Sequence, residues 1–179
     1  MKSTNFKATI EKKIREIKDF PTEGISYKDI TPLLHCPKTS TAVVDAFEQH
    51  LTAIKVDAIV GIESRGFLFG MLLANRLEVP FVPIRKAGKL PHHTIAKEYD
   101  LEYGSATIEI HTDAIKRGWN VIVHDDLLAT GGTANAASDL ISELGGTVSA
   151  YLFLIELAYL SGRELLENNS PNVISLLKY

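Results

Sequence analysis

The sequence predicts an α/β fold, with a mainly parallel sheet that has helices on both faces. The main observation is an alternation from about residue 56 onward, where short apolar runs typical of buried strands are followed by apolar patterns at helical spacing. A second observation is the polar, glycine-containing turn that joins a run to the next helical pattern. A third is size, because 179 residues, 45% of them hydrophobic, suffice for one self-sufficient core.

The N-terminal part of the chain predicts two helices separated by an irregular segment. In the first 18 residues, apolar residues recur every three or four positions, which predicts an amphipathic helix. They are Phe6, Ile10, Ile14 and Ile17. Residues 19–37 contain prolines and a glycine and have no clean period, so we expect turns and short extended pieces there. A second helix is expected over 39–54, with Thr39 or Ser40 as its N-cap.

The rest of the chain predicts strands and helices in alternation. Strands are expected at 57–62, 79–84, 106–110, 120–123, 147–155 and 173–177, and helices at 67–77 and 133–144. The glycine pair at 145–146 ends the last of these helices. Residues 86–103 have no clear period, so we expect a long irregular segment with a function, a plain surface loop being the alternative.

Composition and charge exclude several classes of protein. A net charge of −3 argues against a generic nucleic-acid-binding surface. The single cysteine, Cys36, excludes a disulfide framework and a cysteine-rich metal site. The first 20 residues lack the apolar core of a signal peptide, and the longest apolar stretch, 150–160, is too short to span a membrane. We therefore expect a soluble, cytoplasmic protein with neither nucleic acid nor membrane as its partner.

The most informative stretch of the sequence is 121–133, VIVHDDLLATGGT. A predicted strand delivers two adjacent carboxylates, Asp125 and Asp126, and a turn of small residues precedes the next helix. This turn consists of Ala129, Thr130, Gly131, Gly132 and Thr133. Glycines let consecutive backbone N–H groups converge on one point, and the helix N-terminus adds its positive end. Because the threonine hydroxyls add donors, the sequence predicts a phosphate site built mostly from backbone.

The same stretch indicates which phosphate compound binds. No Lys-Ser or Lys-Thr follows the glycines, which excludes the nucleoside-triphosphate loop, and the dinucleotide pattern GxGxxG is absent. The acids precede the glycines by only a few residues, so they are expected beside the phosphate, at the distance of an attached ribose. Carboxylates accept hydrogen bonds from vicinal hydroxyls and also bind Mg²⁺. We therefore expect a 5-phosphoribosyl site.

Residues 125–133 resemble the phosphoribosyl pyrophosphate motif of the type I phosphoribosyltransferases, and their Leu-Leu-Ala-Thr form is similar to that of the adenine phosphoribosyltransferase family. His124 departs from the motif, where an apolar residue is usual, and it either packs or reaches the site. The likeness covers nearly the whole chain. It implies the type I phosphoribosyltransferase fold in one domain over 1–179, with an N-terminal helix and base-reading hood over about 1–35 and a core over about 36–179.

Segment 20–32 resembles the small hood of this family, which reads the base. The resemblance implies that the main chain around Tyr27 binds adenine, through the backbones of Ser26 and Lys28. The residue type supports the same role, because the face of the Tyr27 ring can stack on a flat base. An aromatic plug against the core is the alternative for Tyr27.

Segment 61–70 resembles the pyrophosphate-binding turn of the family. The resemblance implies that Glu63, Ser64 and Arg65 bind pyrophosphate and that Arg65 also acts in catalysis. Arg65 suits this role chemically, because a planar guanidinium matches phosphate oxygens in a bidentate manner. A surface arginine at a helix N-terminus is the alternative.

Segments 84–91 and 101–104 resemble the two ends of the flexible catalytic loop, which here spans about 86–105. The resemblance implies further pyrophosphate-binding residues. They are Arg85, Lys89 and Tyr103. It also makes Glu102 the catalytic acid that handles the purine ring proton, whereas the sequence alone would favour a solvated glutamate.

The resemblance implies a transfer of 5-phosphoribosyl from phosphoribosyl pyrophosphate to adenine, giving AMP and pyrophosphate in purine salvage. Mg²⁺ would be held mainly by the substrate, with Asp125 or Asp126 as protein ligand. The family also implies a homodimer, in which the Arg85 region of one subunit supports its neighbour.

Two alternative functions remain open at this point. The first is transfer to xanthine, hypoxanthine or guanine, against which the hood and the Leu-Glu-Tyr-Gly segment argue. The second is a regulator that binds phosphoribosyl pyrophosphate without turnover. Such regulators carry a DNA-binding domain before the sugar-phosphate domain, and here only about 20 residues precede the hood.

Overall fold

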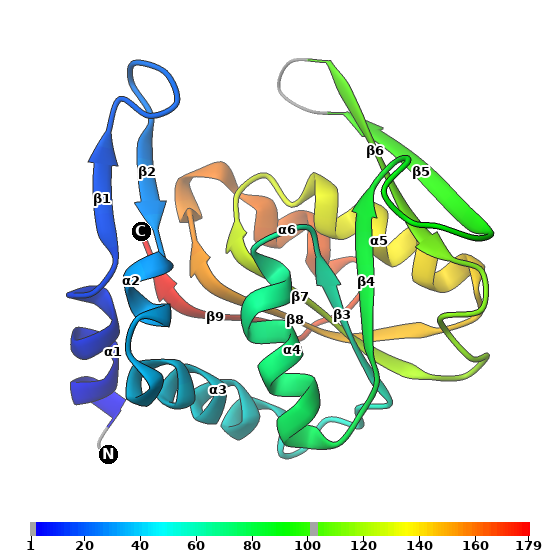
Figure 1. The fold of residues 1–179 in the computed structure, drawn as a ribbon, viewed down its shortest axis with the longest axis horizontal. Coiled ribbons are helices and arrows are strands. Elements are labelled where there is room, and N and C mark those ends of the chain that lie inside the picture. The colour runs from blue at the N-terminus through cyan, green and yellow to red at the C-terminus, as the bar shows by residue number, and fades with distance from the viewer. Residues whose placement is uncertain (1–2, 101–103) are drawn as a thin grey trace. The chain divides into compact units, whose positions relative to one another are not determined.

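The computed structural model describes residues 3–100 and 104–179 (Figure 1). The chain divides into two compact units, Met1–Ala46 and Phe47–Tyr179. The first unit is drawn in blue to cyan and the second in cyan to red in Figure 1. Each unit has its own secondary structure and is described by itself.

The N-terminal unit contains a helix, a hairpin and a short helical turn. Its elements are α1 (Ser3–Glu11), β1 (Arg15–Lys18), β2 (Ser26–Asp29), α2 (Thr31–Leu34) and the start of α3 (Pro37–Leu51). β1 and β2 pair antiparallel, with Ile17 opposite Tyr27. The helix predicted over residues 1–18 is therefore wrong beyond Glu11. The spacing of the isoleucines fits a helix, but strand pairing satisfies the backbone groups of this segment, and local periodicity does not reveal such a partner.

α3 begins at Pro37, earlier than the sequence predicts. The backbone N–H groups of Thr39 and Ser40 donate to the carbonyl oxygen of Cys36 at 2.9 and 3.1 Å. Both residues thus lie inside the helix, and their prediction as N-caps is wrong. The fixed φ of proline suits the first helical position, where no N–H donor is needed.

The second unit is built on a seven-stranded sheet in the order β5-β6-β4-β3-β7-β8-β9. The strands are β3 (Ala58–Ile62), β4 (Phe81–Lys86), β5 (Thr94–Asp100), β6 (Ser105–His111), β7 (Asn120–Leu128), β8 (Thr147–Glu156) and β9 (Val173–Lys178). β3, β4, β7, β8 and β9 pair in parallel, and β6 pairs antiparallel with β4 and β5. The predicted mainly parallel sheet is confirmed.

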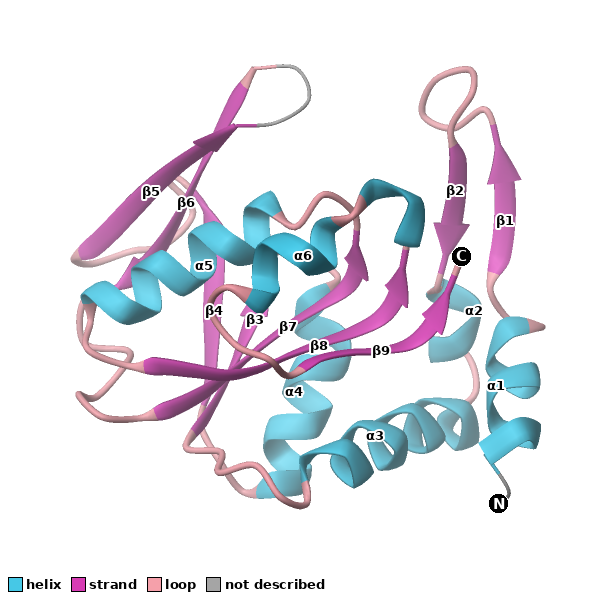
Figure 2. Cartoon of the chain, turned by 180° about the vertical axis from the view of Figure 1, so that it is seen from behind, coloured by secondary structure: helices cyan, strands magenta, loops and turns pink. Residues whose placement is uncertain are grey.

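Helices cover both faces of this sheet, as predicted. α4 (Gly66–Leu77) lies on one face, and α5 (Gly132–Glu143) and α6 (Gly162–Glu167) lie on the other, as Figures 1 and 2 show from opposite sides. A short 3-10 helix, Ala158–Leu160, precedes α6. All five residues of β3 are buried, as expected for a parallel strand covered on both faces. The core therefore fixes the strand ends from which the functional turns leave.

β5 lies within the segment that was expected to be irregular, 86–103. It forms an antiparallel ladder with β6, in which Ile95 faces Ile110 and Tyr99 faces Ala106. Ile95 and Tyr99 are half-buried against the core, while Lys97 pairs with Asp139 on α5 at 2.8 Å. The prediction of an irregular segment is therefore wrong over Thr94–Asp100. Charged residues stand between the apolar ones of this strand, so the sequence shows no clear alternation of apolar and polar residues.

The helices of the described chain are short. α3 has 15 residues, whereas a membrane-spanning helix needs about 20 apolar ones. No helix in residues 3–100 or 104–179 is long and apolar enough to cross a membrane.

Candidate active site

The polar turns that the sequence singles out meet at one edge of the sheet. β3 is paired in parallel with β4 on one side and with β7 on the other, so their carboxyl ends reach the same edge. Ile62 lies beside Ile84, and Gly61 lies beside His124, so the residues that follow are neighbours. Ligands of α/β sheets bind outside this edge. The structure thus brings together three of the predicted segments.

The phosphate turn after β7 depends on Gly131. This residue has φ +83° and is the N-cap of α5. A Cβ on Gly131 would lie 2.7 Å from the carbonyl oxygen of Gly162, so a side chain there meets backbone. The left-handed backbone of glycine therefore leads from the strand into the helix and leaves the first N–H groups of α5 without partners in the helix. This backbone geometry is compatible with the predicted phosphate site, because N–H groups at a helix N-terminus can bind an anion.

Gly162 supports this turn from behind, and the sequence analysis missed it. A Cβ on Gly162 would lie 2.1 Å from the carbonyl oxygen of Ala129 and 2.8 Å from the nitrogen of Gly131. The next residue, Arg163, forms an ion pair with Glu156 and so fixes the start of α6. The two segments are far apart in the sequence, so no local pattern pointed to Gly162.

Thr133 has a hydrogen-bond partner that the sequence did not suggest. Its Oγ1 donates to the hydroxyl of Tyr99 on β5 at 3.0 Å. Thr130 is exposed, which suits a hydroxyl that donates to a bound phosphate. Gly132 lies close to the same strand, because a Cβ there would come within 3.4 Å of the carbonyl oxygen of Asp100. β5 thus packs beside the phosphate turn.

Asp125 and Asp126 lie in the carboxyl-terminal half of β7, next to the N-terminus of α4. Arg65 Nε lies 2.9 Å from Asp126 Oδ2, and the Asp126 side chain is only 3% exposed. The backbone N–H of Asp126 donates to Asp125 Oδ1 at 2.8 Å. A Cβ on Gly66 would lie 3.1 Å from Asp125 Oδ1, so the glycine lets the helix approach the acid. Arg65 and the two acids therefore form one charged cluster, and the ion pair between Arg65 and Asp126 is a contact that the sequence did not predict.

The electrostatics of the acid pair are unfavourable without a ligand. Burial raises the pKa of Asp125 well above its ordinary value, and the adjacent Asp126 carboxylate raises it further. Burial also raises the pKa of Asp126, which the positive charge of Arg65 opposes. Ionisation of this pair therefore lowers the stability of the fold. Such perturbed pKa values are typical of functional sites.

We expect Asp125→Asn to weaken binding of the phosphoribosyl donor about 10-fold or more, because charged hydrogen bonds are lost. The same change should raise the melting temperature at about pH 8, because an aspartate with a raised folded-state pKa destabilises the fold once the pH exceeds its unfolded-state pKa. Asp126→Asn should also weaken donor binding, but it should raise the melting temperature less than Asp125→Asn, because the positive charge of Arg65 opposes the effect of burial on the pKa of Asp126. Calorimetric titration and thermal melting measure both effects. Unchanged donor affinity and turnover in both variants would exclude the ribose assignment.

The predicted pyrophosphate residues form a network in the turns after β3 and β4. Arg85 donates from Nε and Nη2 to the Glu63 carboxylate at 3.2 and 3.0 Å. The hydrogen bond from Arg85 holds the pKa of Glu63 below its ordinary value. Glu63 is thus engaged in placing Arg85, while Ser64 and Lys89 are exposed. The predicted pyrophosphate residues Arg65, Arg85 and Lys89 are cations in the turns that follow β3 and β4 or at the end of β4.

The predicted adenine-binding residues lie on β2 in the N-terminal unit. The Ser26 hydroxyl donates to Glu16 at 2.6 Å, and Lys28 Nζ lies 3.3 Å from the same carboxylate. Tyr27 makes an edge-to-face contact with Phe20, with ring centroids 5.1 Å apart. Both polar side chains are therefore engaged within the hairpin, which fits a role for their backbones. The predicted residues Glu102 and Tyr103 lie outside the described residues.

His124 packs and does not reach the polar turns. Its ring is fully buried, with Nδ1 donating to the carbonyl oxygen of Leu152 at 2.9 Å and an edge-to-face contact with Phe47. Burial lowers its pKa to about 4, so the imidazole is neutral at physiological pH. Of the two alternatives that the sequence left open, the structure selects packing.

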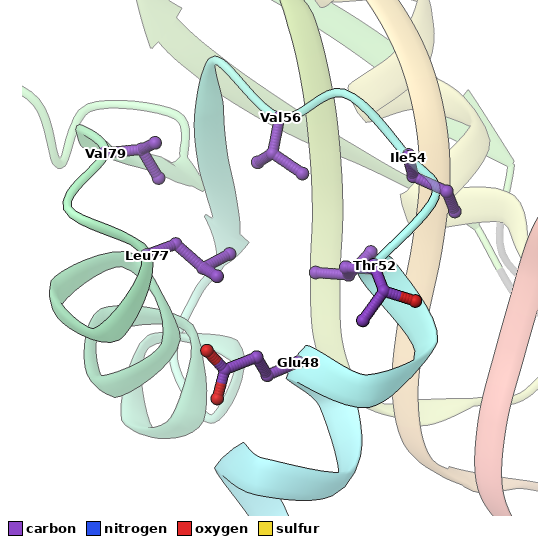
Figure 3. A pocket seen from close by; sticks show the side chains of 7 residues that line it. Glu48, Thr52, Ile54, Val56, Leu77 and Val79 are labelled. Carbon is purple, nitrogen blue, oxygen red and sulfur yellow. The ribbon is translucent and has the colours of Figure 1, made fainter.

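A hollow of about 320 Å³ lies apart from these turns (Figure 3). It is lined by Glu48, Leu51, Thr52, Ile54, Val56, Leu77 and Val79. Val56 and Val79 precede β3 and β4, so the hollow is at the amino edge of the sheet. Glu48 is paired with Arg76 at 2.9 Å, and the lining is mostly apolar. The groups capable of chemistry are therefore at the opposite edge.

Comparisons with known proteins identify the family of the chain. The family model of the phosphoribosyl transferase domain matches residues 30–168. An adenine phosphoribosyltransferase from Christiangramia forsetii is 52% identical over 166 residues, which are 93% of this chain and 96% of that protein.

Solved structures of the same enzyme superpose closely on this chain. The adenine phosphoribosyltransferase of Thermoanaerobacter pseudethanolicus has a TM-score of 0.93 at 48% identity, covering 97% of this chain and 99% of that one. The Saccharomyces cerevisiae enzyme, solved with adenine and an imino-altritol bisphosphate, has a TM-score of 0.92 at 43% identity, with the same coverage. The likeness thus covers nearly the whole length of the chain in both sequence and fold. The chain belongs to the phosphoribosyltransferase family and, within it, to the adenine phosphoribosyltransferases.

Proposed function

We propose that the protein transfers the 5-phosphoribosyl group of phosphoribosyl pyrophosphate to adenine, giving AMP and pyrophosphate in purine salvage. The observation that carries this proposal is one edge of the sheet, where the backbone turn at Gly131 lies beside the Asp125–Asp126 pair and Arg65. The yeast relative was solved with adenine bound. We place the reaction in the cytoplasm, in keeping with the lone cysteine.

In this reaction the bond from the anomeric carbon to pyrophosphate breaks, and the electron pair leaves with pyrophosphate. A ring nitrogen of adenine forms the new bond, and the transition state has oxocarbenium character, as in other glycosidic transfers. The turn 129–133 holds the 5′-phosphate, and Asp125 and Asp126 hold the ribose hydroxyls. Because both ends of the sugar are held, the anomeric carbon is fixed between its two partners.

The cations stabilise the leaving group. Negative charge grows on pyrophosphate as its bond breaks, and Arg65, Arg85 and Lys89 offset it. Arg65 is held by Asp126 and Arg85 by Glu63, so neither guanidinium must reorganise greatly during the reaction. We assign Glu102 the proton of the purine ring, as the family resemblance implies.

The donor set of this site fits Mg²⁺. Mg²⁺ usually binds through one or two carboxylates together with substrate phosphates. Asp125 and Asp126 supply two adjacent carboxylates, one of them already paired with Arg65. No group of three or more His, Cys, Asp or Glu side chains in the described part of the chain could enclose a metal ion, which leaves the phosphates as main ligands. The ion would neutralise charge on the leaving group when bound.

The proposal is tested by incubating the protein with adenine, phosphoribosyl pyrophosphate and Mg²⁺ and measuring the AMP formed by chromatography. Parallel reactions with hypoxanthine, guanine and xanthine test the choice of base, and omission of Mg²⁺ tests the metal. We expect AMP as the main product. Failure to form AMP with active donor would overturn the proposal, and faster use of another purine would correct its substrate.

We also propose that the protein is a homodimer. α4 exposes Leu68, Met71 and Leu72, which are 37%, 52% and 45% accessible. Their spacing of three and four residues places them on one side of the helix. Several large apolar side chains exposed together are typical of a protein–protein contact surface.

We expect Met71→Glu to convert the dimer into a 19.7 kDa monomer, because a buried charge at the contact would be unpaired. Turnover should fall with it if the Arg85 region supports the neighbouring subunit. Sedimentation velocity measures the mass, and Tyr159→Glu is the matched control, since Tyr159 is a 71% exposed aromatic outside α4. A wild-type protein that sediments as a monomer would contradict the proposal.

A further inference from the structure

A buried carboxylate lies under the turn that carries the pyrophosphate cations. Glu109 is on β6, directly opposite Arg85 on β4, and is 6% exposed. Its Oε1 accepts the backbone N–H groups of Lys89 at 2.9 Å and Leu90 at 2.8 Å. Its Oε2 accepts the hydroxyl of Thr94 at 3.4 Å. The reaction described above assigns Glu109 no role.

The contacts of Glu109 keep it in the form that accepts hydrogen bonds. Burial alone would raise the pKa of Glu109, but the backbone N–H groups of Leu90, Gly88 and Lys89 outweigh it and hold the pKa below its ordinary value. At neutral pH the side chain is therefore ionised and acts only as an acceptor. The hydrogen bonds from the successive N–H groups of Lys89 and Leu90 to one carboxylate fix the path of the chain through this turn.

The turn held by Glu109 is continuous with Arg85. The carbonyl oxygen of Lys89 accepts Nη1 of Arg85 at 2.9 Å, and Glu63 accepts the other two guanidinium nitrogens. The peptide groups of Lys89 thus link Glu109 on one side to Arg85 on the other. If this peptide moves, Arg85 loses one of its three supports and the exposed Lys89 side chain loses its anchor.

We propose that Glu109 is a positioning residue for pyrophosphate, which acts by holding the turn 86–90 so that Arg85 and Lys89 point to one place. This inference rests on the proposed function. It explains why a carboxylate is kept near an anion site at all. A free carboxylate would repel pyrophosphate, whereas this one is directed at backbone N–H groups beneath the turn.

Three substitutions of Glu109 distinguish its role in holding the turn from the effect of its negative charge. Glu109→Gln keeps the reach and one acceptor oxygen but removes the charge. Glu109→Asp keeps the charge but shortens the side chain, so that it no longer reaches Lys89 and Leu90. Glu109→Ala removes both. The reverse reaction, from AMP and pyrophosphate, gives separate KM values for the two ligands.

We expect Glu109→Ala to raise the KM for pyrophosphate about 10-fold, because the backbone N–H groups of Lys89 and Leu90 lose their acceptor. Glu109→Asp should behave similarly, and Glu109→Gln should change this KM by less than about threefold, because its amide oxygen still accepts. The KM for AMP should stay near the wild-type value in all three. If charge alone mattered, Glu109→Gln would lower the KM for pyrophosphate and Glu109→Asp would leave it unchanged, which would overturn the inference.

Asp57→Ala is the matched control for loss of a carboxylate that accepts a backbone N–H. Asp57 accepts the N–H of Asn120 at 2.7 Å at the other edge of the sheet. It should lower the melting temperature and leave the KM for pyrophosphate unchanged. If Glu109→Ala does not fold, the Asp and Gln variants decide. A wild-type enzyme that forms no AMP in the forward assay would overturn the proposed function, whereas normal wild-type turnover with an unchanged pyrophosphate KM in every variant would overturn only the role of Glu109.

Discussion

Gly131→Val is expected to abolish binding of the phosphoribosyl donor, whereas Thr130→Ala should weaken it about 10-fold at most, because it removes one hydroxyl donor among several. Two features of Gly131 make the valine harmful. Its φ is +83°, which a β-branched residue rarely adopts, and its Cβ would lie 2.7 Å from the carbonyl oxygen of Gly162. Because backbone cannot move aside as a flexible side chain does, the phosphate turn itself must change shape.

Gly118→Val separates the two causes. Gly118 has φ +80°, but a Cβ there meets no atom within 4 Å. Both valine variants share the cost in folding stability of a left-handed backbone. A further loss of stability in Gly131→Val therefore comes from the crowding at the phosphate turn. Calorimetric titration with AMP and with ribose 5-phosphate measures the binding. If Thr130→Ala proved more harmful than Gly131→Val, the site would depend on side chains and not on the backbone.

Glu102→Gln and Glu102→Leu are expected to lower turnover by about 10²–10⁴-fold, the usual contribution of a general acid or base. Donor binding should change little, because the carboxylate is assigned to the adenine ring and not to the phosphoribosyl group. An interaction made mainly in the transition state lowers kcat and kcat/KM together. Leucine should be at least as damaging as glutamine, since glutamine keeps a polar partner for the ring.

The matched control for Glu102 is Glu98→Gln, which changes an exposed glutamate on β5. That variant should keep wild-type turnover, and unchanged thermal melting of all three proteins would show that the fold is intact. A solvated glutamate does no chemistry. Turnover within about twofold of wild type in both Glu102 variants would therefore remove Glu102 from the catalytic residues and leave the phosphate turn and Arg65.

The central part of the fold could be predicted because its signals are local. β3 is an uninterrupted apolar run, and α4 and α5 each follow a strand through a short turn, with a glycine at the first position of α4 and another as the N-cap of α5. Such patterns report burial on both sheet faces or on one helix face. β1 and β5 were missed for a different reason. β1 belongs to a two-stranded sheet and β5 is the edge strand of the seven-stranded sheet, and both have charged residues between the apolar ones, so their pairing, not their periodicity, makes them strands.

The residues of the candidate site also fall into two groups, those that local sequence indicates and those that only the tertiary structure reveals. The sequence by itself determined the phosphate turn and the acid pair, because Asp125, Asp126 and Gly131 lie within a few residues, and local chemistry sets their backbone and charge. Only the tertiary structure decided which groups support them. Gly162 backs the phosphate turn, Tyr99 accepts from Thr133, and Glu109 holds the turn beside Arg85. Each of these contacts joins segments that are distant in the chain, and their distance is set by strand order and helix packing, which no local pattern of residues encodes.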